Sequence, residues 1–454
     1  MELDLADLFV VALRRATLIR CGLLLAVALG AEACRPAAST RPPASATGPM
    51  TQQAYVWQRV WTPEVRAAVE HEQAQPMQGF GVFAAEVSLA TKRVIRPALN
   101  YAALKSTGKP MAPVIRVEPY FGPFQENDPA TRQLVETARE RIAEWRQNGI
   151  EPVELQLDFD CADSKLDGYR VWLRALREAV RPLPVCPTTL PSWLNRPEFA
   201  ELARESGRYV LQVHCVAPPR QLADAQARLT DPVRAAQWVE QAGQLGVPFR
   251  VALPTYAYLV AFDAHGKVRG VSAEGPSSRW PDDVRVVRWE ADPGELAELM
   301  RQWARARPAA MTGVIWYRLP VAGDTLNWRW PTLAAVMQGR APRRDLRVEA
   351  SAAQPSEVVA INGGERDEPL PETVEASWSG ARFVAADALE GYDLERPAEE
   401  RVRFIRQPAT GLSRLPPGAQ RSIGWIRCEP STKIRISPGD RVDTGSAGGA
   451  GHGH

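Results

Sequence analysis

Short apolar strands alternate with amphipathic helices eight times between residues 51 and 342, and this alternation restricts the folds open to the chain. The helix segments at 128–147 and 231–246 are the clearest, because each begins with Asp-Pro and ends at a glycine. Eight strand–helix units over about 290 residues are typical of a (β/α)8 TIM barrel, an α/β fold. We predict its strands at 54–61, 79–88, 113–120, 153–160, 183–190, 208–214, 248–256 and 313–320.

Two other regions depart from this alternation. Residues 258–274 read as a β-hairpin that turns at 264–266. From about residue 346 the chain shows short strands with turn residues and no long helix, which predicts a small antiparallel β domain after the barrel. The predicted organisation is a signal peptide at 1–33, a disordered linker at 34–50, a TIM barrel at 51–342, a small β domain at 343–432 and a disordered tail at 433–454.

The N-terminus has the character of an export signal. Three arginines precede the apolar run 21–34, which is too short to be a comfortable permanent membrane span. The run resembles a bacterial lipoprotein signal, and this resemblance implies that Cys34 is lipidated and becomes the new first residue. Glu32 stands where a small residue is usual, so cleavage near Ala33, releasing a soluble periplasmic protein, is the alternative. We expect a location on the periplasmic side of a bacterial membrane, with a lipid anchor on Cys34.

Charge and histidine content argue against two classes of function. The 55 Lys and Arg residues nearly balance the 53 Asp and Glu residues and form no basic stripe, so we expect no nucleic-acid partner. Only five histidines occur, two of them in the terminal GHGH, and none has zinc-ligand spacing with a cysteine. We therefore expect neither a metal nor a cofactor, and the sequence does not indicate an oligomeric state.

The cysteines outside the signal region do not form a disulfide pattern. Cys161, Cys186, Cys215 and Cys428 are widely spaced, and no CxxC motif occurs. We expect buried free thiols, and the pairing to check is Cys161 with Cys186 or Cys215.

Polar residues fall at the predicted C-terminal ends of the strands, where the active site of a TIM barrel lies. In LQLDFD (155–160) apolar and polar residues alternate, so that the apolar set should face the helices and Asp158 and Asp160 the lumen. Charges in a lumen are costly unless paired, so a salt bridge from Arg116 to Glu118 or Asp158 is the structural alternative. The same alternation places at this end Glu86, Arg116, Glu118, Gln212 and His214.

Aromatic residues gather at the same strand ends. Carboxylates beside flat apolar rings are typical of carbohydrate sites, because sugar CH faces stack on rings while hydroxyls bond to acids and amides. The alternative is that each ring only fills the barrel rim. We expect a carbohydrate ligand. The rings concerned are Trp57, Trp61, Tyr120, Phe121, Trp193, Tyr256, Tyr258, Tyr317 and Trp328.

The strand LQLDFD and its following helix resemble the strand-four signature of chitinase-like glycoside hydrolases. In that family acidic residues alternate and the last of them is a catalytic Glu. Here Ala162 stands at that position, and Asp163 is out of phase on an extended strand. The arrangement of retaining glycosidases, with an acid after strand four and a nucleophile after strand seven, is also absent from the sequence, because strand seven ends in LPTY (253–256) without a carboxylate.

A second resemblance covers most of the chain after the signal region. Seven blocks occur in order that are similar to exported proteobacterial proteins of the domain of unknown function 3142 family. This resemblance implies a barrel and an envelope location, and it brings no established activity. The blocks are YVWQRVWTP, QLDFDCADSKL, TLPSWL, VLQVH, PFRVALPTY, SAEGP and IWYRLP.

The leading hypothesis is an envelope protein whose barrel binds a polysaccharide and, in its hydrolytic version, cleaves it. Asp160 would act as general acid or base, with Glu118 or Glu86 opposite. The first alternative is a catalytically inactive carbohydrate-binding or assembly lipoprotein, which the Ala162 position favours. The second is an amidase or deacetylase that uses Cys161 or Cys215 with His214, although His214 and Cys215 are adjacent and should face opposite ways. The predicted substrate-binding residues are Asp158, Arg116, Gln212, His214, Trp193, Tyr256 and Tyr317.

Overall fold

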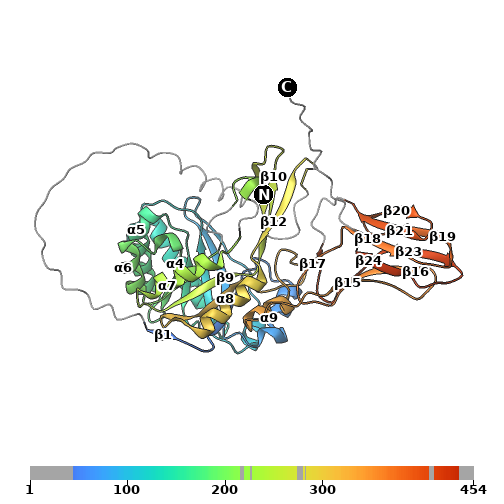
Figure 1. Ribbon diagram of the computed structural model, residues 1–454. Coiled ribbons are helices and arrows are strands. Elements are labelled where there is room, and N and C mark those ends of the chain that lie inside the picture. The colour runs from blue at the N-terminus through green and yellow to red at the C-terminus, as the bar shows by residue number, and fades with distance from the viewer. Residues whose placement is uncertain are drawn as a thin grey trace, which may run out of the picture. The chain divides into compact units, whose positions relative to one another are not determined.

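The computed structural model describes residues 44–438, except 215–218, 225–227, 274–279, 282 and 408–413. The chain divides into two compact units, the first ending at Ala341 and the second beginning at Pro342. The first unit mixes helices with strands, and the second consists of strands (Figure 1). None of the described helices is long and apolar enough to cross a membrane. The predicted signal peptide, with Cys34, lies outside the described residues.

The first unit contains a closed barrel of eight parallel strands among the described residues. Neighbouring strands follow the order β2-β14-β9-β8-β7-β6-β5-β3, and the pairing of β2 with β3 closes the ring. Each strand therefore lies beside its neighbour in the chain, and the predicted (β/α)8 barrel is confirmed. The strands are β2 Thr51–Val56, β3 Phe80–Ser88, β5 Met111–Val117, β6 Leu155–Asp158, β7 Val185–Thr189, β8 Tyr209–Gln212, β9 Phe249–Pro254 and β14 Met311–Tyr317.

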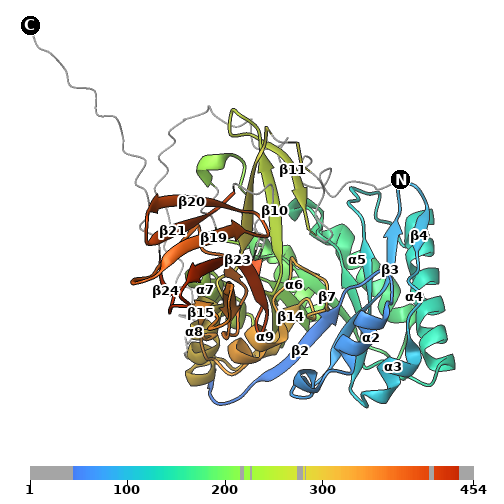
Figure 2. The same cartoon turned by 90° about the vertical axis from the view of Figure 1, so that its right-hand side faces the viewer.

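Helices follow these strands and cover the outside of the barrel, as α4 and α5 do in Figure 2. Local sequence explains where several of them begin. Asp128, Asp231 and Asp292 each accept hydrogen bonds from backbone N–H groups of the first turn, and each precedes a proline. The helices are α2 Pro63–Val69, α3 Tyr101–Ser106, α4 Pro129–Gln147, α5 Leu166–Ala179, α6 Pro197–Ser206, α7 Pro232–Gly243, α8 Pro293–Arg305 and α9 Trp330–Met337.

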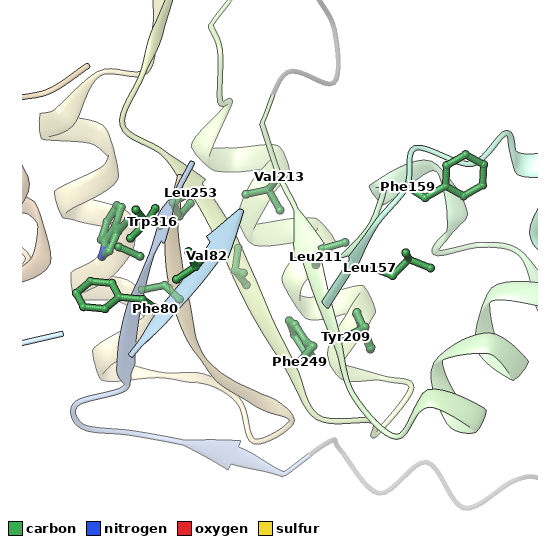
Figure 3. Close-up of a cluster of buried hydrophobic side chains, with 14 of the residues drawn as sticks. Phe80, Val82, Leu157, Phe159, Tyr209, Leu211, Val213, Phe249, Leu253 and Trp316 are labelled. Atoms are coloured by element: carbon green, nitrogen blue, oxygen red, sulfur yellow. The ribbon is translucent and has the colours of Figure 1, made fainter. Parts of the chain in front are cut away.

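The main hydrophobic core lies between the strands and the helices. On α5, Tyr169, Trp172 and Leu176 repeat at helical spacing and are fully buried. They pack with Leu157 and Phe159, the apolar set of the LQLDFD segment, whose outward direction is thereby confirmed. Burying a side chain of this size stabilises the fold by about 1.5–3 kcal/mol. Figure 3 shows part of this core, with Phe80, Val82, Leu157, Phe159, Tyr209, Leu211, Val213, Phe249, Leu253 and Trp316 labelled.

A second, smaller cluster fills the barrel lumen. Tyr55 packs there with apolar residues of the other strands, and its hydroxyl donates to Gln156 Oε1 at 2.8 Å. Gln156 donates in turn to Glu154 Oε1 at 2.9 Å, and Glu154 is ion-paired with Arg250. The lumen is therefore a packed interior crossed by a polar chain, and a ligand can enter only at its ends.

A three-stranded antiparallel sheet interrupts the last part of the barrel. Its order is β11-β10-β12, formed by β10 Ala257–Phe262, β11 Val268–Ser272 and β12 Arg285–Glu290. The hairpin predicted at 258–274 is confirmed by the pairing of β10 with β11. Strand β12 was not predicted, because its exposed and buried residues do not alternate and its partner lies more than 20 residues away. A short strand, β4 Arg93–Ile95, pairs with β3 in the antiparallel sense.

The folded chain begins before the start predicted from composition. β1 Ser45–Ala46 pairs with β13 Arg307–Pro308, ahead of the first barrel strand. Arg307, buried and only 8% exposed, donates hydrogen bonds to the carbonyls of Gly48 and Pro49. The linker predicted to extend to residue 50 is therefore too long. Backbone groups of this Pro- and Ala-rich segment form hydrogen bonds with the barrel, and composition alone does not reveal such bonds.

The second unit is a sandwich of two four-stranded antiparallel sheets, with strand orders β15-β16-β23-β19 and β20-β21-β18-β24. Val358, Val374 and Phe404 come from both sheets and are buried in one core. Strand β24 belongs to this sheet, so the tail predicted from residue 433 begins too early. The strands are β15 Leu346–Ala350, β16 Ser356–Asn362, β17 Glu368–Pro369, β18 Thr373–Ser377, β19 Arg382–Ala388, β20 Tyr392–Ala398, β21 Arg401–Arg406, β22 Arg414–Leu415, β23 Gln420–Glu429 and β24 Arg435–Pro438.

Candidate active site at the barrel mouth

Three charged residues stand in one row at the C-terminal end of the barrel. Glu86 on β3 is the register partner of Arg116 on β5, and Arg116 is the partner of Asp158 on β6. Because adjacent strands are about 4.8 Å apart, these side chains are neighbours. The sequence placed all three at this end, and strand pairing brings them together.

Asp158 is held by two hydrogen bonds from the next two strands. Thr188 Oγ1 donates to Asp158 Oδ1 at 2.8 Å, and Gln212 Nε2 donates to the same oxygen at 3.2 Å. These two donors fix the orientation of the Asp158 carboxylate. Gln212 was predicted from the sequence and Thr188 was not, although Thr188 shares the face of Cys186, which lines the lumen two residues earlier.

Asp160 follows β6 and remains accessible to solvent, although protein surrounds it on several sides. The pKa of its carboxyl is raised to about 6, because the loss of hydration and the nearby charge of Asp158 raise it by more than Arg116 lowers it. A carboxyl with this pKa holds a proton in part of the molecules near neutral pH. Asp160 can therefore donate a proton to a ligand at the barrel mouth.

Arg116 makes no hydrogen bond or ion pair with any residue that the structure describes. The predicted salt bridge to Glu118 or Asp158 is therefore not formed. Burial lowers the pKa of Arg116, but the surrounding Asp158, Tyr317, Asp160 and Glu86 raise it above its ordinary value. The guanidinium thus stays charged with its donors available for the oxygen atoms of a ligand.

Glu86 and Glu118, predicted to stand opposite Asp160, are engaged by arginines of neighbouring segments. Glu86 is buried and ion-paired with Arg59, and Glu118 accepts from Arg93 Nη2 at 3.0 Å. Burial tends to raise the pKa of Glu118, but hydrogen bonds from Ser88 and Arg93 together with the Arg93 charge bring it below the ordinary value. Sequence spacing could not reveal the pair of Arg93 with Glu118, because Arg93 lies outside the barrel strands; Arg59 lies in the first predicted strand, 54–61, but its pairing with Glu86 was not predicted.

An aromatic wall, defined here as Trp57, Tyr256, Tyr317 and His214, lines the same end. The Tyr317 ring centroid lies 5.1 Å from Trp57, 5.3 Å from Tyr256 and 5.7 Å from His214, on which it stacks. His214 Nδ1 lies 3.2 Å from the Tyr256 hydroxyl. Burial lowers the pKa of His214 to about 4, so the imidazole is neutral near pH 7. Trp57, Tyr256 and His214 are buried and Tyr317 is partly exposed, so among these four residues Tyr317 offers the most surface to a ligand.

Trp193 does not belong to this site, which corrects the sequence prediction. Its side chain has no exposed surface and packs against Tyr169 and Phe199 in the core between strands and helices. A residue without exposed surface cannot contact a ligand. Trp328 is likewise buried beside Trp316, whereas Phe121 is 51% exposed.

The thiol-based alternative finds little support among the described residues. Cys161, Cys186 and Cys428 are buried free thiols, as expected. Burial raises the pKa of the Cys161 thiol to about 12, so it is not a thiolate at neutral pH. Cys215 lies outside the described residues. Within the described part of the chain, no group of three or more His, Cys, Asp or Glu residues is arranged to hold a metal.

Fold and site define the class of the first unit: a TIM barrel with carboxylates, an arginine and aromatic rings at its C-terminal mouth. Residues 107–322 match the family model described as Domain of unknown function (DUF3142), which confirms the resemblance seen in the sequence. Residues 346–429 match a second model, Domain of unknown function (DUF8456). No curated protein matches the sequence.

Several solved glycoside-hydrolase structures are similar to the chain. The spore cortex-lytic enzyme SleL of Bacillus megaterium QM B1551 is 12% identical with a TM-score of 0.44, over 66% of this chain and 76% of that chain. The GH18 chitinase ChiB of Flavobacterium johnsoniae is 9% identical with a TM-score of 0.40, over 64% and 94%. The GH18 chitinase of Cycas revoluta in complex with (GlcNAc)3 is 11% identical with a TM-score of 0.39, over 63% and 97%. At these values the likeness is one of barrel fold, and no substrate follows from it.

Proposed function

We propose that the barrel mouth binds a polysaccharide and hydrolyses its glycosidic bonds, with Asp160 as the proton donor. The observation that carries this proposal is the accessible Asp160 carboxyl of raised pKa, two residues beyond the hydrogen-bonded Asp158 that ends β6. Glycoside hydrolysis needs one carboxyl that holds a proton and a second that is ionised. The partly exposed ring of Tyr317 and the donors of Arg116 supply contacts for sugar rings and hydroxyls.

Asp158 is the best-placed ionised partner of Asp160. Glu86 and Glu118, the partners inferred from spacing, are held by arginines, and a role for either in the reaction requires that its arginine move. Asp158 instead accepts neutral donors from Thr188 and Gln212 and keeps its negative charge facing the mouth. Such a charge stabilises the positive character that a sugar ring acquires in the transition state.

The test is a panel of bacterial and environmental glycans assayed for binding and for new reducing ends. On a glycan that is cleaved, Asp160→Asn should lower turnover at least about 100-fold while changing the dissociation constant only a few-fold. Asp163→Asn is the matched control, because Asp163 lies three residues further on, bonded to Ser192 rather than to the charged row. Equal losses in the two variants would contradict the role of Asp160.

A second candidate is a barrel that binds glycans without cleaving them. Ala162 favours this function, because it precedes the short 3-10 helix Asp163–Lys165 at the position where chitinase-like enzymes carry their Glu. Isothermal titration would then show binding to glycan fragments, dependent on Arg116 and the aromatic wall. No reducing ends would form on prolonged incubation with the unaltered protein.

We also propose that the protein is exported and held on the periplasmic side of a bacterial membrane by a lipid on Cys34. The apolar run 21–34 and its preceding arginines support this location. Metabolic labelling with a radioactive fatty acid should label the parent protein and not Cys34→Ser, which should leave the membrane fraction. Unlabelled, soluble parent protein would instead indicate cleavage near Ala33.

A further inference from the structure

A pocket lies at the opposite end of the barrel from the proposed active site. Its volume is about 420 Å³, and it is formed by the C-terminal ends of α5 and α6 and by the segments that lead into β7 and β8. Four arginines line it, with a single carboxylate among its lining residues. They are Arg174, Arg177, Arg181, Arg208 and Glu178. This end of a TIM barrel normally serves stability, so a charged pocket here requires another explanation.

The arginines are exposed, and their partners do not neutralise all of them. Arg181 pairs with Glu178 at 2.9 Å, with the two side chains 74% and 69% exposed. Arg174 pairs with Glu205, which is shared with a further arginine of α5. Arg177 has no carboxylate partner among the described residues and donates to the backbone carbonyl of Glu205.

Arginine at a helix end has a simpler explanation, because the carbonyls there carry partial negative charge. Each helix C-terminus is equivalent to about −0.5 charge, and two helices end at this pocket. Among the lining residues, four arginines stand against the single carboxylate of Glu178, and the carboxylates outside the lining that pair with Arg174 and Arg208 are each shared with another arginine. The lining residues therefore carry more positive charge than the two helix ends offset, which an anionic group such as a phosphodiester would balance.

The N-terminal segment of the chain reaches the barrel at this same end. β1 pairs with β13, which directly precedes the start of β14, and Gly48 N donates to Ala304 O at 2.7 Å. Strands β14 and β7 are three steps apart in the barrel, or about 15 Å. Nine residues lie between Cys34 and Ala44, and the chain from one to the other can span at most about 35 Å. A lipid on Cys34 would therefore tether the barrel within about 35 Å of Ala44, which lies at the same end of the strands as the arginine pocket.

We propose that the pocket binds the phosphate of an anionic phospholipid headgroup and sets the barrel on the membrane with its mouth facing away. The exposed guanidiniums supply paired donors for phosphate oxygens, which arginine binds in bidentate geometry. The anchor alone would let the barrel rotate, whereas a second contact at the same end fixes its direction. This inference is independent of whether the mouth hydrolyses its ligand.

Vesicle sedimentation tests the proposal. The protein is prepared without residues 1–33, which leaves all described residues intact and removes the apolar run and the anchor. It is mixed with phosphatidylcholine vesicles, with or without about 30% phosphatidylglycerol, at low and high salt. We expect binding to the anionic vesicles that weakens with salt, and about tenfold weaker binding for the double variant Arg177→Gln/Arg181→Gln.

The matched control is Arg66→Gln/Arg132→Gln, which removes two exposed arginines from α2 and α4. It should bind anionic vesicles within about twofold of the parent, and thermal melting should show all proteins folded. Equal losses in both double variants would overturn the pocket, because they would reflect net charge alone. Binding of inorganic phosphate in calorimetry without binding to vesicles would overturn the lipid assignment.

Discussion

Asp158 ends strand β6 and Asp160 lies two residues beyond it, yet their carboxyls have different surroundings. Asp158 accepts two hydrogen bonds within the barrel wall, whereas Asp160 stands beyond the strand without a described donor and beside the charge of Asp158. Arg116, the register partner of Asp158, places a positive charge close to both carboxyls. Two carboxyls whose environments differ in this way can divide the roles of proton donor and charge stabiliser between them.

The first prediction concerns the pH dependence of any hydrolysis. Asp160 must be protonated to act as an acid, and its raised pKa of about 6 keeps the proton on in acidic solution. The turnover rate should therefore fall as the pH rises through about 6, tenfold per pH unit above it. A pH–rate profile on a cleaved glycan measures this, and a rate that is flat from pH 5 to about 8 would contradict the assignment.

The second prediction concerns His214 and the stability of the fold. Burial lowers its pKa in the folded protein to about 4, below the ordinary 6.5 of an unfolded chain. Only the unfolded state takes up this proton between these values, so stability falls by up to about 3 kcal/mol as the pH drops from 6.5 to 4. Replacing His214 by Gln should remove that part of the decline in urea unfolding at pH 7 and about pH 4.5.

The control for this experiment is His265→Gln, a change at an exposed position in the hairpin turn. It should reproduce the pH dependence of the parent. If His214→Gln does so as well, the imidazole gains its proton in the folded protein at the same pH as in the unfolded chain.

At the scale of elements, the sequence predicts what local chemistry determines. Asp-Pro starts define α4, α7 and α8, and alternation in β6 correctly sends Leu157 outward and Asp158 inward. Pairings between distant segments were not predictable. Strand β12 forms by pairing with β10, and the short strand β1 forms by pairing with β13, so neither is signalled by its own sequence.

The candidate site shows the same division. Parity on single strands placed Glu86, Arg116 and Asp158 at one end, and register then joined them. The burial of Trp193 was not predictable, because it depends on Tyr169 and Phe199 from two other helices. The same holds for Arg93, which comes from a segment with no fixed spacing to the site, whereas Arg59 lies in the first predicted strand and its pair with Glu86 was missed.

The third prediction concerns the ion pair that joins β6 to β9 across the lumen. Glu154 is 3% exposed and pairs with Arg250. Glu154→Gln would leave the guanidinium without its carboxylate, and unfolding in urea should show a loss of about 3 kcal/mol. Adding Arg250→Met should restore part of the loss, because the uncompensated charge is then removed as well.

Glu178→Gln is the surface counterpart. It breaks the exposed pair with Arg181 and should cost less than about 1 kcal/mol. A loss as small as this from Glu154→Gln would mean that the lumen pair is hydrated and contributes little.

For the whole molecule, the division into a barrel and a sandwich matters because each unit has its own core. The barrel contains the strand–helix core and the lumen cluster, and the sandwich contains a third cluster of its own. The carboxylate mouth and the arginine pocket both belong to the barrel, at opposite ends of its strands. The proposed sites for a ligand and for a membrane can therefore be altered independently, because no described residue belongs to both.

The fourth prediction is that the two units unfold separately. Phe404 is fully buried in the sandwich core, and Phe404→Ala should destabilise that unit by about 3–5 kcal/mol. Scanning calorimetry should then show one transition moved to lower temperature and another unchanged, since units with separate cores unfold as separate cooperative transitions. Phe249→Ala, made in the barrel core, should move the other transition instead. A single transition that both variants shift equally would show that the sandwich and the barrel fold as one cooperative unit.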